Sequence, residues 1–88
     1  MRVQAVAVSE QLAADDSPDL LVMQGEQMIR LGPVGRCVYE QAQRSISIDD
    51  LVCACVRVLG PAPGGLARDL VRAAVDDLSR QGLVVILP

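Results

Sequence analysis

Alternation of apolar and polar residues predicts strands in the first third of the chain. Val3–Val8, VQAVAV, alternates weakly and is partly β-branched, which favours a first strand. Residues 9–19, SEQLAADDSPD, are rich in Asp, Ser and Pro, so we expect a loop there. Two short apolar segments, Leu20–Met23 and Glu26–Leu31, follow as a second and a third strand.

Gln24-Gly25 separates the second and third predicted strands, and glycine supplies the positive φ that a tight hairpin needs. With this dipeptide as a two-residue turn, Met23 pairs with Glu26 and Leu21 pairs with Met28. One face of the hairpin is then apolar and directed at the core; it carries Leu20, Val22, Ile29 and Leu31. The opposite face carries Leu21, Met23 and Met28 beside Glu26 and Arg30. Because that face is more apolar than a solvent face should be, it either packs near the first strand or docks a partner.

Apolar residues at helical spacing predict three helices in the rest of the chain. Their expected bounds are Pro33 to about Arg44, Ser47 to Leu59, and Leu66 to Gln81. Proline suits a first helical turn, and serine is a good N-cap. A loop of Pro and Gly occupies residues 60–65, and Gly82 is a C-cap signal with Leu83 placed against the last turn. Residues 83–87, LVVIL, can form a short final strand.

The order of elements predicts one α+β domain spanning residues 1–88. We expect a three-stranded antiparallel sheet followed by a three-helix bundle, in an outline like a winged helix-turn-helix. A domain of 88 residues buries less of its unfolded surface than a larger one.

Composition excludes several functions. The chain has no His, which rules out Ser-His and Cys-His catalytic arrangements within it, and no glycine-rich phosphate loop follows a strand. Three cysteines with no histidine do not have zinc-site spacing, so we expect no metal and no cofactor. An odd cysteine count, no signal-like start and no long apolar run indicate a cytoplasmic protein without a membrane partner. We expect no catalysis by this chain alone.

Two stretches carry a resemblance: LLVMQGEQMIRLGPVGRCVYEQAQRSISIDDLVCACV, from Leu20, and LVRAAVDDLSRQGLVVI, which ends at Ile86. The features that carry it are a hairpin strand ending in Leu31, Gly35 early in the next helix, SIDDLV opening the second helix and DDLSRQGLV closing the third. This pattern resembles the PqqD-like family, the peptide-recognition elements of pathways that modify ribosomally made peptides.

The resemblance implies that the leader segment of a precursor peptide adds as a strand antiparallel to the third strand. It would lie in a cleft between that strand and the third helix, and main-chain bonds would supply affinity. The peptide-binding residues expected on the strand are Gln27, Met28, Ile29, Arg30 and Leu31. On the helix, Arg68 and Arg72 hold acidic leader residues or are simply solvated, and Val71 and Val75 floor the cleft or belong to the core.

In lasso peptide biosynthesis, free-standing members of this family and size carry the precursor to a separate leader peptidase. The resemblance therefore implies a peptide chaperone of this kind. Leu21, Met23 and Met28 would then dock that partner enzyme. A chaperone of the pyrroloquinoline quinone type is the first alternative. A DNA-binding winged-helix regulator is the second, although a net charge of −3 and three aspartates among the arginines of the third helix oppose it. We therefore expect no nucleic-acid partner.

Overall fold

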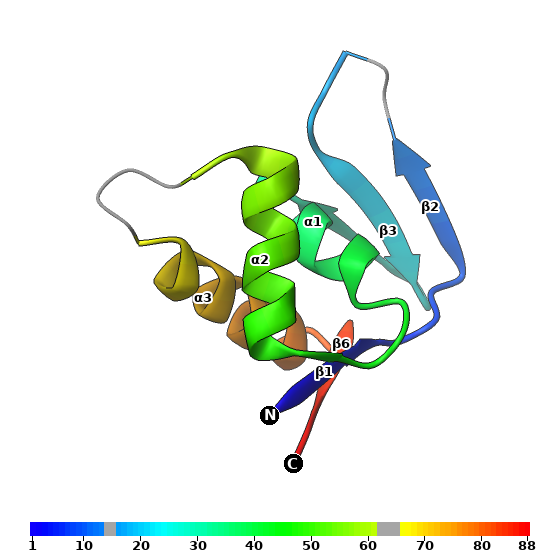
Figure 1. Cartoon of the computed structure of the whole chain (residues 1–88). Coiled ribbons are helices and arrows are strands. Elements are labelled where there is room, and N and C mark those ends of the chain that lie inside the picture. Colours follow the sequence, from blue (N-terminus) through cyan, green and yellow to red (C-terminus); the bar gives the residue numbers. More distant parts are fainter. Residues whose placement is uncertain (14–15, 62–65) are drawn as a thin grey trace.

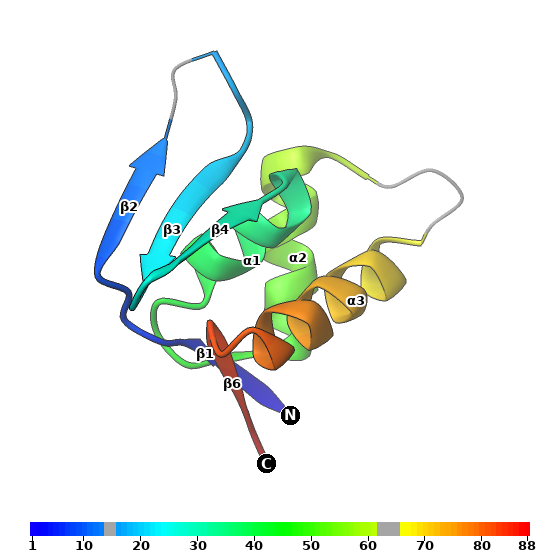
Figure 2. The ribbon, with the colours of Figure 1, turned by 180° about the vertical axis from the view of Figure 1, so that it is seen from behind.

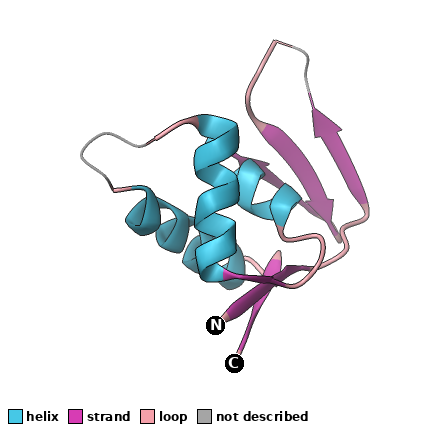
Figure 3. Ribbon diagram, in the orientation of Figure 1, coloured by secondary structure: helices cyan, strands magenta, loops and turns pink. Residues whose placement is uncertain are grey.

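The computed structural model describes residues 1–13, 16–61 and 66–88 (Figures 1 and 3). Within them the strands are β1 (Arg2–Ala5), β2 (Glu10–Ala13), β3 (Leu20–Gln24), β4 (Gln27–Leu31), β5 (Ile46–Ser47) and β6 (Val84–Leu87). The helices are α1 (Pro33–Gln41), α2 (Ile48–Leu59) and α3 (Ala67–Arg80). The described residues therefore form an α+β fold with two small antiparallel sheets and three helices, which confirms the predicted fold class at that level.

The first sheet has the order β2-β3-β4, and we call it the hairpin sheet. Its β3–β4 hairpin was predicted, but the predicted register is wrong, because Gln24 pairs with Gln27 and Met23 with Met28. The turn is therefore centred on Gly25 and Glu26. Gly25 has a φ of +62° and no non-glycine residue in the described ranges has a positive φ. These angles match a turn with glycine at its first central position, whereas a turn centred on Gln24-Gly25 would force glutamine into that conformation.

The second sheet has the order β5-β1-β6, and we call it the terminal sheet. The strand predicted at Val3–Val8 is shorter and starts one residue earlier, at Arg2–Ala5. It was expected beside the hairpin but belongs to the terminal sheet. Its register with β6 runs from Arg2–Leu87 to Ala5–Val84, so the two ends of the chain pair with each other (Figure 1). The predicted final strand is confirmed, and the two-residue β5 was not foreseen.

Strand β2 lies where the sequence predicted a loop, so that expectation is wrong over Glu10–Ala13. The Asp- and Pro-rich part of the stretch starts only after this strand; residues 14–15 of the predicted loop lie outside the described part of the chain. The backbone N–H of Ser9 donates to the Met23 carbonyl over 2.9 Å, at the start of the β2–β3 ladder. Glu10–Ala13 have no strand pattern of their own, and they form a strand by pairing with the edge of β3.

Helices α1 and α2 begin where their capping signals predicted, and α3 begins one residue after the expected Leu66. All three end within a few residues of the predicted positions. Pro33 occupies the first turn of α1, and the Ser47 hydroxyl accepts from the Asp50 N–H over 3.1 Å at the start of α2. Helix α1 ends at Gln41, three residues before the expected end. Residues 62–65 of the predicted Pro and Gly loop lie outside the described ranges.

The core lies between the helices and the inner faces of both sheets. On the hairpin sheet Leu20, Val22 and Leu31 are buried and Ile29 is half-buried, which confirms the predicted core face. The remaining buried core residues are Val3, Cys37, Val38, Tyr39, Ala42, Leu51, Cys55, Val71, Val75, Leu78, Leu83 and Val84. The only aromatic ring is buried among them, and its hydroxyl donates to the Val6 carbonyl over 3.0 Å.

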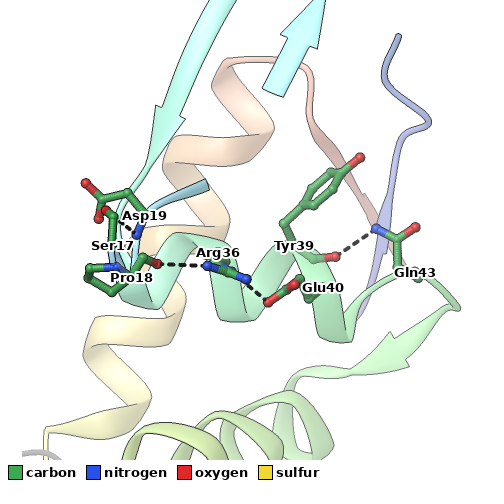
Figure 4. Close-up of polar contacts among 7 residues, drawn as sticks. All are labelled: Ser17, Pro18, Asp19, Arg36, Tyr39, Glu40 and Gln43. Carbon is green, nitrogen blue, oxygen red and sulfur yellow. Dashed lines mark hydrogen bonds and ion pairs between the residues drawn. The ribbon is translucent and has the colours of Figure 1, made fainter. Parts of the chain in front are cut away.

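A polar contact joins α1 to the segment that leads into β3. Arg36 donates to the Pro18 carbonyl over 3.5 Å and to the Glu40 carboxylate over 3.2 Å (Figure 4). This contact holds the entry of the hairpin sheet beside the first helix. No helix in the described ranges is long and apolar enough to cross a membrane.

Candidate functional site: a cleft between strand β4 and helix α3

Strand β4 is an edge of the hairpin sheet, and within the described ranges it pairs with β3 alone. In a two-residue hairpin the pair that flanks the turn, here Gln24 and Gln27, is hydrogen-bonded, and the pairing then alternates along the ladder. Ile29 therefore bonds to β3, whereas the N–H and C=O groups of Met28 and Arg30 point to the open edge. Such unpaired backbone groups are the template for an added strand.

Helix α3 forms a wall opposite this edge. The cleft between them is lined by residues of β4, the start of α1 and α3: Arg30, Leu31, Gly32, Gly35, Ala74, Asp77, Leu78 and Gln81. Figure 2 shows β4 and α3 on the same side of the molecule, with α1 behind them. The volume of the cleft, about 180 Å³, is below the roughly 300–1,000 Å³ of typical small-molecule pockets.

Small residues keep the cleft open at its Leu31 end. A methyl group added at Gly32 would meet nothing within 4 Å, and one added at Gly35 would meet only the Leu31 side chain, at 3.7 Å. Both glycines therefore leave room above Leu31. Ala74 faces them from α3 and is half-buried.

The other end of the cleft is fixed by a contact between β3 and the end of α3. The Gln24 side chain donates to the Gly82 carbonyl over 3.0 Å. Gly82 has a φ of +77°, and the Leu83 N–H donates to the Leu78 carbonyl over 2.8 Å, which is the C-terminal motif that the sequence predicted. The end of α3 therefore lies beside the start of β4, so the helix and the strand run in opposite directions.

The predicted residues of the third strand lie together on β4 but face in different directions. Gln27, Met28 and Arg30 are exposed, Ile29 is half-buried and Leu31 is buried. Arg30 forms an ion pair with Asp19. Leu31 contributes to the core and also lines the cleft, so it connects the two.

The structure places the predicted residues of the third helix away from the cleft. Val71 and Val75 are 2% and 0% exposed, so they belong to the core. Arg68 forms an ion pair with Asp49 of α2, and Arg72 is exposed one turn further along that flank of α3. An acidic leader residue held in the cleft by these arginines does not fit this placement.

The wall of the cleft is formed by residues of α3 that the sequence analysis missed: Ala74, Asp77, Leu78 and Gln81. Their spacing of three, one and three residues follows one helical stripe. The apolar stripe of the third helix in the sequence, Val71, Ala74, Val75 and Leu78, includes two of these residues, but it indicates only a core face. The structure shows that Ala74 and Leu78 also face the cleft. Asp77 also contacts Arg80 over 3.1 Å, with both side chains largely exposed.

The outer face of the hairpin sheet is a second exposed surface. Leu21 and Met23 are two residues apart on β3 and Met28 pairs with Met23, so the three residues proposed for partner docking share this face. Leu21 and Met23 are half-buried and Met28 is 60% exposed. Leu12 of β2 pairs with Leu21 and extends the apolar area, with 51% of its surface exposed. It was missed because β2 was not predicted.

Catalytic and metal-binding arrangements gain no support from the described residues. They contain no group of three or more His, Cys, Asp or Glu side chains that could hold a metal ion. Burial, together with the neighbouring Cys37, raises the pKa of the Cys55 thiol from 9.0 to about 12. That thiol stays protonated at neutral pH and is therefore a poor nucleophile.

Comparisons with known proteins give no family assignment. No protein-family model matches the chain, and no curated protein or solved structure matches it significantly.

Proposed function

We propose that this protein binds an extended peptide by adding it as a strand to the open edge of β4. The peptide is the leader segment of a ribosomally made precursor, and the protein delivers it to a leader peptidase in lasso peptide biosynthesis. The single observation that carries the proposal is the coincidence of an unpaired strand edge with a cleft walled by α3. The leader and its pathway come from the resemblance to the PqqD-like family.

The proposed arrangement of the helices and the β3–β4 hairpin is like that of a winged helix-turn-helix, adapted to bind peptide. Met28 and Arg30 supply the main-chain donors and acceptors for the added strand. The peptide's inward side chains lie against Leu31 and Leu78, which are 3% and 2% exposed.

Charge supports a peptide over DNA. The exposed aspartates of α3, Asp69, Asp76 and Asp77, are equal in number to its arginines, Arg68, Arg72 and Arg80, so the helix has no net positive charge. A helix presented to DNA needs an excess of cations, because phosphate neutralisation supplies much of the affinity.

The test uses peptides that correspond to the N-terminal halves of the proteins encoded by short open reading frames next to the gene for this protein. Each peptide is labelled, and its binding to the protein is measured by fluorescence polarisation. We expect one of them to bind, and Met28→Pro to weaken its binding about tenfold or more by removing a donor from the open edge.

Met28→Thr is the matched control, because it changes the same side chain and keeps the backbone N–H. It should bind far more tightly than Met28→Pro, with both variants folded by circular dichroism. Equal affinity of folded Met28→Pro and wild type for every binding peptide would refute strand addition to β4.

A further inference from the structure

The two ends of the β4–α3 cleft differ in chemistry. At the Leu31 end the lining is mostly small and apolar, with Gly32, Gly35 and Ala74 around buried Leu31. Arg30 also lines this end, but it pairs with Leu21 on the outer face of the sheet, and its guanidinium forms the ion pair with Asp19. Toward the Gln24–Gly82 contact the α3 wall presents Asp77 and Gln81. An occupant therefore meets an apolar recess at one end and a carboxylate at the other.

Antiparallel addition to β4 fixes which end of the peptide meets which chemistry. Because β4 runs from Gln27 to Leu31, the N-terminal part of the added strand lies at the Leu31 end. Its C-terminal part lies toward Asp77 and Gln81.

The spacing along α3 sets the separation of the two preferred side chains. Ala74 and Asp77 are three residues apart, which is about 4.5 Å along a helix axis. Side chains on one face of a strand repeat every second residue, about 6.6 Å. Peptide side chains two residues apart are the nearest match to the spacing of Ala74 and Asp77, and a long basic side chain spans the difference.

We propose that the cleft selects peptides with a large apolar residue followed two positions later by Arg or Lys. The apolar side chain fills the recess above Gly35 and Ala74, and the cation binds Asp77. This inference rests on the proposed strand addition and specifies the peptide that it accepts. Arg80 does not block the cation, because exposed ion pairs contribute only about 0–1 kcal/mol.

Neighbouring residues on α3 supply matched controls for both selections. Ala73 and Asp76 are exposed and lie outside the cleft lining, whereas Ala74 and Asp77 line it. The paired variants are Asp77→Arg with Asp76→Arg, and Ala74→Leu with Ala73→Leu. Each pair changes the same residue type by the same substitution at adjacent positions.

The experiment selects binders from a phage-displayed library of random linear peptides on the wild-type protein. We expect enrichment of the apolar-x-basic order. A selected peptide should lose about tenfold or more in affinity on Asp77→Arg, and about twofold or less on Asp76→Arg. Replacing its basic residue by Glu should restore binding to Asp77→Arg. Ala74→Leu should weaken binding more than Ala73→Leu, because leucine fills the recess.

The outcomes separate this inference from the proposed function. Suppose that the selected peptides lose binding to Met28→Pro but lack the apolar-x-basic order, or that they respond equally to Asp77→Arg and Asp76→Arg. Either result overturns the inference and leaves strand addition standing. Selected peptides that bind Met28→Pro as well as wild type overturn strand addition itself. The Asp77 pair decides the inference even if Ala74→Leu does not fold.

Discussion

The hairpin sheet has two edges, β2 and β4, and they differ in what covers them. Strand β2 is exposed at all four residues, including Gln11 and Ala13, which share the inner face of the sheet with the buried Val22 and Leu20. Strand β4 has its inner face on the core and α3 opposite its open edge. An unpaired edge alone is common and is usually protected against pairing, whereas a wall beside it adds the side-chain contacts that make binding specific.

The difference arises because the helices cover only part of the sheet. They lie against β3 and β4, and β2 extends past them (Figure 2). Strand β2 therefore contributes mainly to the outer apolar face through Leu12. If the proposed peptide binding is correct, the β4 edge is its site, because only that edge has a wall beside it.

The largest expected effect separates the two strands by their contribution to stability. Leu31→Ala should lower the free energy of unfolding by about 2–5 kcal/mol, because it opens a cavity at a side chain that is 3% exposed. Leu12→Ala should change it by about 0.5 kcal/mol or less. Urea unfolding followed by circular dichroism measures both. Similar losses for the two variants would mean that β2 packs on the core as β4 does.

A second comparison tests the direction of the backbone groups on β4. Ile29→Pro should cost about 1–3 kcal/mol, because the Val22 carbonyl loses its donor within the sheet. Met28→Pro should cost less, since its N–H faces the open edge. Thermal melts of the two variants decide. A greater loss for Met28→Pro would reverse the assigned alternation and move the template to Ile29.

The contact that fixes the end of the cleft should have a smaller effect. Gln24→Ala removes the bond to the Gly82 carbonyl and should lower the free energy of unfolding by about 0.5–1.5 kcal/mol. Amide hydrogen exchange should increase at Gly82 and Leu83. Gln27→Ala, across the turn, is the control and should leave that exchange unchanged. No change in either variant would show that the cleft is held by other contacts.

The smallest expected effect concerns the ion pair at the open edge. Asp19→Asn should lower the free energy of unfolding by about 0.2–1 kcal/mol, because the Arg30 side chain is 73% exposed. The loss should shrink as salt is added. Asp16→Asn, an exposed neighbour, controls for the change in net charge. A salt-independent loss would contradict a screened surface pair and indicate that Asp19 acts through packing.

The sequence predicted most elements because their signals are local. Pro33, Ser47 and Gly82 set helix boundaries by capping chemistry, and alternation in β3 and β4 identified the core face. The hairpin register is also set locally, and its prediction was wrong because the positive φ belongs at the first central position of the turn, which places Gly25 and Glu26 at its centre. The predicted core and outer faces of the hairpin are still correct, because the observed pairing differs from the predicted one by an even number of residues.

Only the tertiary structure decided which strands pair and what faces the edge of β4. Strands β1 and β6 pair although they lie at opposite ends of the sequence, and β2 forms by pairing with the edge of β3. Likewise, the rotation of α3 buries Val71 and Val75 and turns Ala74 and Asp77 toward the cleft. Periodicity identifies the apolar stripe of a helix, but its flanks are distinguished only by the neighbours that pack against them.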